Sequence, residues 1–456
     1  MRMPDPLVAR LWEPLWDLKE RSVRLQTYRR LRRRQFDPPE TLRQRRVRRL
    51  RRLLDHALAT SPFHRERLRA AGIEPAGVND VADLAGLPLL TKADVRDHLD
   101  AILSTAYRRE DLVEAKTGGS TGTALRVYCD RTGVQRRQGA ALLTDSWSGW
   151  RLGQPVAAVW GNPPRPRSLR NRLRAWLKDR WIYLDTMHLD RPAVERFVAE
   201  WRRLRPGLLY GHAHSLFLLA EMVADMGAEL RPSGIVATSM MLLEPERRVI
   251  ERVFACPVTN RYGCEEVSLI ACECERHRGL HVNAEHAYVE VLRDDGTPCA
   301  PGEDGRIVVT ELVNFGMPMI RYAVGDRGVW SPEPCPCGRP WPLLARVTGR
   351  TADFLRALDG SRVAGISLIE NTLTRFPGVA QMQIVQREPA RILVRLVPGD
   401  GWEEGVQERL SDVFREALGR EMGVEFALVD AIPREPNGKY RFSICELDGE
   451  VADRDA

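Results

Sequence analysis

The sequence predicts an α/β protein in which a large N-terminal domain with mostly parallel sheets precedes a small α+β C-terminal domain. Three observations carry this prediction. The first hundred residues have helical patterns, short apolar runs then alternate with helical stretches, and a strand–strand–helix–strand pattern fills the last hundred residues. Alternation of buried strands with helices is typical of a parallel sheet. We therefore divide the chain into a helical segment of the large domain over 1–84, a core over 85–350 and a C-terminal domain over 351–456.

The elements of the core follow from local patterns, taken in chain order. Thr91-Lys92-Ala93-Asp94 has the spacing of a capping box, so a helix is expected to begin there. Helices are expected where apolar residues recur at helical spacing, and strands where short apolar runs are bounded by turns. The expected strands are Val156–Trp160, Ile235–Thr238, Glu290–Leu292 and Gly305–Glu311, and the expected helices are Leu216–Met226 and Pro245–Phe254.

The pattern changes after Gly349-Arg350, where two β-runs precede a helix and a further strand. The runs are Met382–Gln386 and Arg391–Val397, separated by a turn-rich stretch, and the helix is Val406–Leu418. A short strand near Val424–Val429 completes the pattern of a small α+β domain.

The composition is that of a globular chain, with 456 residues of which 43% are hydrophobic. This length is sufficient for two or more domains with a substantial core. No run of about 18 apolar residues occurs, so no membrane span is expected. The N-terminal sequence lacks the charged-then-apolar layout of a signal peptide, and we expect a cytoplasmic protein without a membrane partner.

The net charge of +7 rests almost entirely on arginine, because only five of the 69 basic residues are lysine. The densest stretch, Arg21–Arg52, suits either a nucleic-acid arm or the charged face of amphipathic helices. Aromatic residues are sparse in it and no known binding motif accompanies it, so we favour a solvated helical face and expect no nucleic-acid partner. Its apolar residues recur at heptad-like spacing, at Leu31, Val47, Leu50, Leu53 and Leu54.

The most informative segment is Lys116–Ala124, with the sequence Lys-Thr-Gly-Gly-Ser-Thr-Gly-Thr-Ala. Its small residues let backbone N–H groups turn toward one point, and its hydroxyls add donors, which suits a loop that cradles phosphates. The usual phosphate-loop pattern has a Lys directly after the last Gly, and no Lys stands there. On the loop alone, a flexible linker explains the composition equally well.

Two further segments suit a bound nucleotide. Tyr262 precedes Gly263, as expected where a base stacks on a ring with the backbone close by, and Glu266 follows as a candidate ligand of Mg²⁺. A core tyrosine and a surface glutamate explain this segment equally well. Asp326 follows a Gly turn and can accept both hydroxyls of a ribose, with a helix N-cap as the alternative.

Lysine is so rare in this chain that its position is informative. The segment Pro436-Asn437-Gly438-Lys439-Tyr440-Arg441 presents Lys439 on a turn near the C-terminus. Lysine is a compact point charge on a flexible stem, which suits a carboxylate and a phosphate that move during a reaction. A surface lysine without a role is the alternative.

Nine cysteines in a chain without an export signal argue against a disulfide framework. Cys274-x₆-His281 and Cys335-x-Cys337 supply three thiolates and one imidazole, the ligand set of a closed structural zinc site. Unliganded thiols are the alternative to zinc. The competing ligands are Cys272 and His277.

The order of these motifs resembles that of the adenylate-forming superfamily. The likeness is closer to its phenylacetate–CoA ligase-like branch, which includes proteins labelled as capsular-polysaccharide biosynthesis proteins. It covers about residues 85–445. The motifs that carry it are Thr117–Ala124, Tyr262–Glu266, Arg321–Asp326, Gly349–Asp353 and Gly438–Lys439, with further likeness in Leu89–Asp94, Tyr210–Ala220 and Gly279–Glu285.

The resemblance implies a two-step reaction driven by ATP. A carboxylate attacks the α-phosphate of ATP, which gives an acyl-adenylate and pyrophosphate, and an acceptor then displaces AMP. The acceptor is the thiol of CoA or of a carrier protein, an amine or a hydroxyl, and the sequence does not distinguish them. ATP, Mg²⁺ and a structural Zn²⁺ are the implied cofactors, and some relatives carry zinc at the matching positions.

The resemblance also implies a role for each matched residue of the nucleotide site. Tyr262, with Gly263 beside it, would stack on adenine, and Asp326 and Arg350 would contact the ribose. The residues that would hold the phosphates are Thr117, Gly118, Gly119, Ser120, Thr121, Gly122 and Thr123.

Two charged residues would act at the reacting groups. Glu266 would bind Mg²⁺, and Lys439 would bridge the α-phosphate and the substrate carboxylate. Catalysis of this kind depends on positioning and on charge neutralisation at phosphorus. The small domain would reorient about a hinge at 350–353 between the two half-reactions, which delivers and withdraws Lys439.

Three positions depart from the usual pattern of the branch. Ala124 ends the loop where Pro is common, Met240 replaces an acidic residue, and Ala352 replaces a charged hinge residue. These departures motivate the alternative of a catalytically altered or non-catalytic homologue that acts as a scaffold in a biosynthetic pathway. The identity of the acid and the oligomeric state stay open, with a homodimer as one option. The residues expected to line the acyl pocket are Trp160, His212 and Thr238–Met241.

Overall fold

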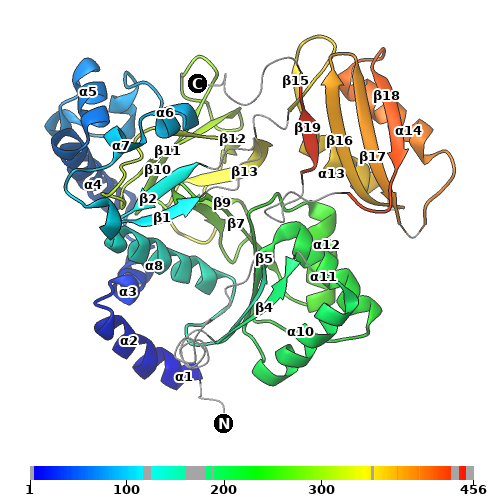
Figure 1. The fold of residues 1–456 in the computed structure, drawn as a ribbon, viewed down its shortest axis with the longest axis horizontal. Helices are drawn as coiled ribbons and strands as arrows, with labels where there is room; N and C mark the ends of the chain where they lie inside the picture. The colour runs from blue at the N-terminus through cyan, green and yellow to red at the C-terminus, as the bar shows by residue number, and fades with distance from the viewer. Residues whose placement is uncertain are drawn as a thin grey trace.

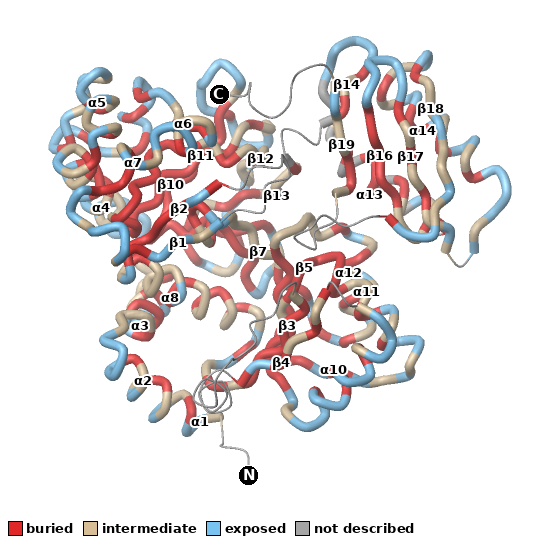
Figure 2. Tube along the Cα trace, in the orientation of Figure 1, coloured by how far each residue is buried: buried red, intermediate tan, exposed pale blue. Residues whose placement is uncertain are grey.

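The computed structural model describes residues 5–116, 125–160, 180–186, 189–350, 354–376, 378–399, 401–432 and 441–447 (Figure 1). A large α/β body carries one eleven-stranded sheet, and a smaller unit with a four-stranded sheet lies to the right in Figure 1. Buried residues follow the sheets and the inner faces of the helices (Figure 2). The expected fold class is therefore confirmed. No helix that the structure describes is both long and apolar enough to cross a bilayer.

The N-terminal segment is helical, as predicted. The arginine-rich stretch forms α3 (Arg24–Arg34) and α4 (Pro39–Thr60), and its heptad-like leucines are buried because they face the core. The amphipathic helices expected there are confirmed. The other elements of this segment are α1 (Asp5–Leu7), a π-helical turn (Val8–Trp12), α2 (Glu13–Lys19), α5 (Pro62–Ala70), α6 (Lys92–Asp97), α7 (Leu99–Ile102) and the 3₁₀ turns Pro75–Gly77, Val81–Leu84 and Arg109–Asp111.

Thr91 caps α6 as the capping box predicts. Its Oγ1 accepts a hydrogen bond from the backbone N–H of Asp94 at 3.1 Å, and the Asp94 carboxylate accepts one from the backbone N–H of Thr91 at 2.8 Å. Leu90, directly before this cap, bonds through its backbone N–H to the carbonyl of Arg321. The start of α6 is thereby fixed against the segment that leads into Asp326.

The large sheet has the strand order β10-β11-β12-β13-β9-β8-β7-β6-β5-β3-β4. Its parallel half runs from β4 to β7, and the mostly parallel arrangement expected from the sequence is confined to it. The reason is connectivity, since only helical crossovers return the chain in the same direction. This half comprises β3 (Val156–Trp160), β4 (Trp181–Asp185), α10 (Arg191–Leu204), β5 (Leu208–His212), α11 (Ala213–Asp225), β6 (Gly234–Thr238), α12 (Glu244–Phe254) and β7 (Val258–Cys264).

The other half of the sheet is antiparallel, so the sheet as a whole is mixed. Its strands are joined by turns and loops without intervening helices. They are β8 (Ser268–Glu273), β9 (Leu280–Val282), β10 (Ala287–Leu292), β11 (Asp304–Glu311), β12 (Tyr322–Trp330) and β13 (Leu343–Arg350).

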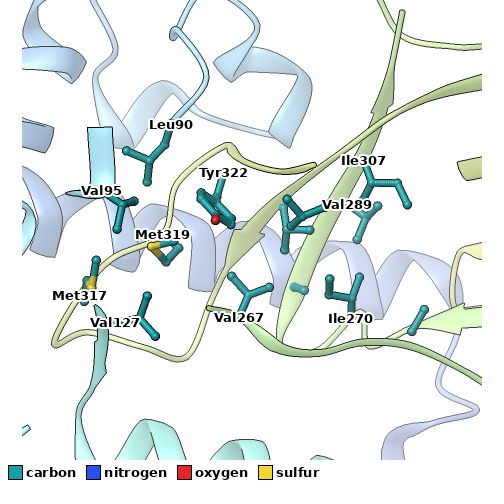
Figure 3. Close-up of a cluster of buried hydrophobic side chains, with 14 of the residues drawn as sticks. Leu90, Val95, Val127, Val267, Ile270, Val289, Ile307, Met317, Met319 and Tyr322 are labelled. Atoms are coloured by element: carbon teal, nitrogen blue, oxygen red, sulfur yellow. The ribbon is translucent and has the colours of Figure 1, made fainter. Parts of the chain in front are cut away.

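The glycine-rich segment 117–124 lies outside the described residues, but the strands on either side of it are described. β1 (Val113–Lys116) and β2 (Arg126–Cys129) pair antiparallel, with Lys116 opposite Arg126. α8 (Arg131–Trp147) follows. Val127 of β2 packs into a buried cluster with Met317, Met319 and Tyr322 (Figure 3), so the base of the segment is anchored in the core.

The small unit has its own core beneath a sheet of order β18-β17-β16-β19. Ile384, Val394 and Phe414 are among its fully buried residues. The elements predicted for this region are confirmed, whereas the domain boundaries at 84 and 350 stay predictions. The elements are β14 (Phe354–Arg356), β15 (Arg362–Ala364), α13 (Gly365–Arg375), β16 (Val379–Glu388), β17 (Arg391–Pro398), α14 (Val406–Leu418), β18 (Gly423–Leu428) and β19 (Ser443–Cys445).

Candidate active site

The carboxyl ends of the parallel strands meet at one edge of the large sheet. Trp160 ends β3, His212 ends β5 and Thr238 ends β6. The ring centroids of Trp160 and His212 are 4.1 Å apart, and those of Trp160 and Tyr210 are 5.4 Å apart with planes inclined by 17°. Ligands of open α/β sheets bind outside the carboxyl ends of the strands, so this edge is the first candidate for a binding crevice.

Tyr262 lies near the carboxyl end of β7, the last parallel strand, and meets Asp326 there. Its hydroxyl donates a hydrogen bond to Asp326 Oδ2 at 2.7 Å. Asp326 lies within β12, opposite Arg350 of β13 in the strand register. The helix N-cap alternative for Asp326 is wrong, because a strand runs through residue 326. Three residues predicted to contact adenosine thus lie close together, although the side chain of Arg350 is outside the described residues.

Glu266 lies in the turn between β7 and β8 and is only 6% exposed, so it is not the surface glutamate of the alternative interpretation. Tyr322 donates a hydrogen bond to Glu266 Oε1 at 2.9 Å. Burial and the neighbouring Glu266 carboxylate raise the pKa of Tyr322 well above its usual value, so the phenol stays a protonated donor. This bond uses one carboxylate oxygen, and a carboxylate held in this way can bind a hard cation through the other.

Arg137 of α8 fixes the backbone beside this carboxylate. Its guanidinium donates to the carbonyl oxygen of Glu266 at 2.8 Å and forms an ion pair with Glu311 at 2.6 Å. Arg137 and Glu311 are both largely buried, so the pair is shielded from solvent. α8 follows directly after β2, so one helix connects the β1–β2 pair to the backbone of Glu266.

Lys92 lies next to the strand that carries Asp326, and sequence reasoning did not select it. Its Nζ lies 3.3 Å from the position that a Cβ at Gly325 would occupy, one residue before Asp326. Gly325 has a φ of +85°, which favours glycine, and its missing side chain makes room for the lysine. The available signal was the scarcity of lysine in this chain, which we applied only to Lys439.

The structure brings together the four residues of the predicted zinc site. One ligand atom each from Cys274, His281, Cys335 and Cys337 lie within 4.8 Å of one another. The Sγ atoms of Cys274 and Cys335 are 3.7 Å apart, and Cys337 Sγ is 3.2 Å from His281 Nε2. Tetrahedral zinc with bonds of about 2.3 Å to sulfur requires sulfur atoms roughly 3.8 Å apart, so the donor set fits this metal.

The surroundings shift the pKa values of the four ligands in different directions, because burial raises those of the Cys274 and Cys335 thiols, whereas those of His281 and Cys337 are lowered. Burial lowers the pKa of His281 to about 4, which keeps the imidazole neutral at pH 7. Its Nδ1 lies 3.4 Å from the carbonyl oxygen of Trp341, an orienting contact of the kind that metal-bound histidines make. Burial raises the pKa of the Cys337 thiol, but the backbone N–H and side chain of Arg339 outweigh it and the pKa lies below its usual value.

The two competing ligands lie elsewhere. Cys272 is fully buried on β8, where it pairs in register with His281 of β9 but is not part of the four-residue group. His277 instead lies 3.2 Å from the carboxylate of Glu273. The grouping of the described residues therefore selects the set predicted from the sequence over its competitors.

Met240, the departure from the acidic pattern, lies between two cores. It packs against the core of the parallel half and also against the core of the small C-terminal unit. Leu243, three residues later, is buried in the C-terminal core. An apolar residue at 240 therefore contributes to the contact between the two parts of the molecule.

Several predicted site residues lie outside the described residues. They include the whole glycine-rich segment Thr117–Ala124, the hinge residues Ala352 and Asp353, and Lys439. Their roles stay predictions.

Sequence relatives extend over most of the chain. The family described as the CapK C-terminal domain matches residues 356–446. Protein CapK of Staphylococcus aureus is 24% identical over 393 residues, which are 84% of this chain and 85% of that protein. A phenylacetate-coenzyme A ligase of Thermus thermophilus is 26% identical over 434 residues, 89% of this chain and 96% of the ligase. The resemblance to the phenylacetate–CoA ligase-like branch is confirmed.

Solved structures share the fold of this chain. A 2-hydroxyisobutyryl-CoA ligase in the postadenylation state, in complex with R3-HIB-AMP, has a TM-score of 0.74 at 20% identity and covers 90% of this chain and 91% of its own. The amide bond synthetase McbA from Marinactinospora thermotolerans has a TM-score of 0.53 at 16% identity, with 88% and 98% covered. Both share the fold with this chain.

Proposed function

We propose that the protein is an ATP-dependent ligase that converts a carboxylic acid into an acyl-adenylate and transfers the acyl group to the thiol of CoA. The observation that carries the proposal is the convergence of Tyr262, Asp326 and Glu266 beside the carboxyl ends of the parallel strands. These residue types in this arrangement suit a base, a ribose and a phosphate-bound cation respectively.

CoA is the acceptor that the relatives favour. One relative is named phenylacetate-coenzyme A ligase, and a 2-hydroxyisobutyryl-CoA ligase of the same fold has been solved with 2-HIB-AMP and CoA. The alternative acceptors are a carrier-protein thiol, a hydroxyl and an amine. The amine is retained because an amide bond synthetase has the same fold. ATP and CoA are abundant in the cytoplasm, the expected location.

In this proposal Tyr262 and Asp326 form the adenosine contact together. The hydrogen bond between them holds the tyrosine ring in one orientation and aims the Asp326 carboxylate. The ring then offers a flat face to adenine, and the carboxylate accepts hydrogen bonds from ribose hydroxyls. Arg350, opposite Asp326 in the strand register, would reach the same sugar.

Glu266 would hold Mg²⁺ close to the phosphates. A bound Mg²⁺ would neutralise charge on the phosphate oxygens. Tyr322 orients the carboxylate through Oε1, and Arg137 holds its backbone. The ammonium of Lys92 beside Gly325 would add a positive charge on the Asp326 side of the crevice.

The remaining parts of the mechanism rest on residues outside the described ranges. Residues 117–123 would present backbone N–H groups and hydroxyls to the phosphates, from a hairpin whose two strands are anchored in register. Lys439 would bridge the substrate carboxylate and the α-phosphate, which brings the two reacting groups together and stabilises the developing charge.

Zinc would be structural. Cys274, His281, Cys335 and Cys337 would fill all four positions of a tetrahedral ion, which leaves none for substrate. Such an ion would fasten the segment after β8 to the connection between β12 and β13. Glu266 lies in the turn before β8, and Asp326 lies within β12. Metal analysis of the purified protein tests this part separately from activity.

ATP–pyrophosphate exchange across a panel of carboxylic acids tests the proposed function. We expect exchange with at least one acid, followed by CoA-dependent release of AMP with the same acid. If none of the acids supports exchange, the proposal is contradicted and the alternative of a non-catalytic scaffold is favoured instead. The described geometry does not favour that alternative. Exchange without CoA-dependent turnover, but with turnover on an amine, would retain the adenylation step and change the acceptor.

A further inference from the structure

The first helices of the chain turn an apolar stripe toward solvent. Leu7, Leu11, Leu15 and Leu18 are 46%, 57%, 58% and 76% exposed. They recur at intervals of three and four residues across α1, the π-helical turn and α2, so they lie on one face. Single exposed leucines are ordinary, but a contiguous row of four marks a surface that another body covers.

The buried residues of the same segment are Val8, Glu13 and Asp17, so two carboxylates lie on the side where an ordinary surface helix has apolar residues. Glu13 and Asp17 are 9% and 7% exposed, and both form ion pairs with Arg24 of α3. Asp17 also accepts a hydrogen bond from the backbone N–H of Leu25 at 2.8 Å. These contacts hold the segment in one orientation, so the leucines face outward because the carboxylates are bound inward.

The exposed charged residues of the same stretch of chain are mostly basic. Within residues 5–36, all of which the structure describes, the exposed acidic residues are limited to Glu20. Figure 2 shows exposed positions along α1, α2 and α3 at the edge of the molecule near the N-terminus. The exposed cationic residues of this stretch are Arg10, Lys19, Arg21, Arg29, Arg32 and Arg33.

We infer that the segment Asp5–Arg34, here called the N-terminal docking surface, binds the surface of an anionic lipid membrane. Leucines beside lysine and arginine are the composition of helices that lie in the plane of a bilayer, with the apolar face at the boundary of headgroups and acyl chains. The basic residues would lie over anionic headgroups. The segment lies on the membrane and does not cross it, which agrees with the lack of a spanning helix in the described chain. This inference revises the expectation of no membrane partner.

A second copy of the chain fits the stripe less well. Two such surfaces facing each other would bring like charges together, which costs binding energy at an interface. Four partly exposed leucines also supply only part of the roughly 800 Å² per partner that a stable interface requires. A lipid surface needs neither shape complementarity nor a neutral partner.

Vesicle sedimentation with the full chain tests the inference. We expect binding to vesicles of phosphatidylcholine mixed with phosphatidylglycerol, weaker binding to phosphatidylcholine alone, and a loss of binding as salt screens the exposed charges. Leu11→Glu/Leu15→Glu should lower the partition coefficient on the order of tenfold or more, because two apolar contacts become charged. Leu428→Glu is the matched control, since Leu428 is 53% exposed on β18 and far from the docking surface in sequence.

A second variant tests the charges separately. Arg29→Gln/Arg32→Gln/Arg33→Gln leaves the leucines intact and should weaken binding while making it less dependent on salt. Unchanged unfolding midpoints would show that the variants are folded. Two results would overturn the inference. One is that the wild-type protein does not bind anionic vesicles, and the other is that the leucine variant binds them as strongly as the wild type. A dimer in light scattering that the leucine variant converts to a monomer, without vesicle binding, would assign the stripe to a second copy instead.

Discussion

The candidate nucleotide site and the cysteine cluster are built on the same sheet, yet they use their polar groups in opposite ways. At the nucleotide site, Asp326 and Glu266 each accept a hydrogen bond from a tyrosine that orients the carboxylate. In the cluster, the four ligand atoms lie within 4.8 Å of one another, and three of the four residues are buried. The first arrangement positions groups for a ligand that comes and goes, whereas the second is complete once a single ion is bound.

This difference predicts how each region responds to substitution. A change at the nucleotide site should reduce catalysis and leave folding intact, because the oriented groups serve the ligand. A change in the cluster should reduce metal content and stability first, because the ligands serve the fold. The experiments below test this separation, from the largest expected effect to the smallest.

Lys439→Ala should have the largest effect. Without the charge that bridges carboxylate and phosphate, adenylate formation should fall by roughly 10²- to 10³-fold or more. Carboxylate-dependent pyrophosphate release measures the loss. Lys19→Ala is the control, since Lys19 is an exposed lysine of α2, and it should retain the wild-type rate in an assay without lipid. A near wild-type rate for Lys439→Ala would remove this lysine from the mechanism.

Glu266→Gln should follow, with a loss on the order of 10²-fold in the adenylation rate that excess Mg²⁺ partly restores. The amide oxygen of glutamine can still accept the hydrogen bond of Tyr322, so the unfolding midpoint should change little. Glu265→Gln removes the same charge one position earlier at an exposed residue and should be close to wild type. If both variants lose the same fraction of the adenylation rate, the loss comes from the change in net charge, and a specific role for Glu266 is contradicted.

Cys335→Ser/Cys337→Ser should act on stability before catalysis. We expect zinc content to fall from one ion per chain to near zero and the unfolding midpoint to fall by several degrees, since the bound ion is part of the folding energy. Cys445→Ser, at a half-buried cysteine outside the cluster, is the control and should keep its metal. Wild-type protein without zinc, or a double variant with unchanged metal content, would contradict the site.

Local structure in this chain could be predicted because local patterns decide it. α14 was expected over Val406–Leu418 and has these bounds, and the apolar run Val156–Trp160 is strand β3 as predicted. Each of these elements is specified by its own residues, through helical periodicity in one case and a continuous buried run in the other. The cysteine cluster could also be predicted, since ligand type and spacing carry a direct chemical signal.

Pairing between distant segments could not be predicted in this way. The antiparallel half of the sheet depends on which strands meet across loops, and no local pattern encodes that choice. The bond from Tyr322 to Glu266 joins residues 56 positions apart, and no pattern in the sequence pairs these two motif residues with each other. The N-terminal helices show the same limit, because Glu13 and Asp17 turn inward only to meet Arg24.

Tyr262→Phe should have the smallest effect on adenylation, and it best distinguishes a role in ligand binding from a role in stability. It keeps the aromatic face for adenine and removes only the hydrogen bond to Asp326. A neutral donor to a carboxylate contributes about 1.5–3 kcal/mol, so a loss of roughly 10- to 100-fold is the upper range if the bond serves catalysis alone. We expect a smaller loss, several-fold and mainly in KM for ATP, because Asp326 remains within the strand and can reorient.

Tyr107→Phe, at a half-buried tyrosine packed against His56, controls for removal of a hydroxyl elsewhere. A lower unfolding midpoint with an unchanged KM for ATP would mean that the Tyr262–Asp326 bond stabilises the fold. The nucleotide site would then respond to substitution as the cysteine cluster does, and the proposed difference between the two regions would be wrong.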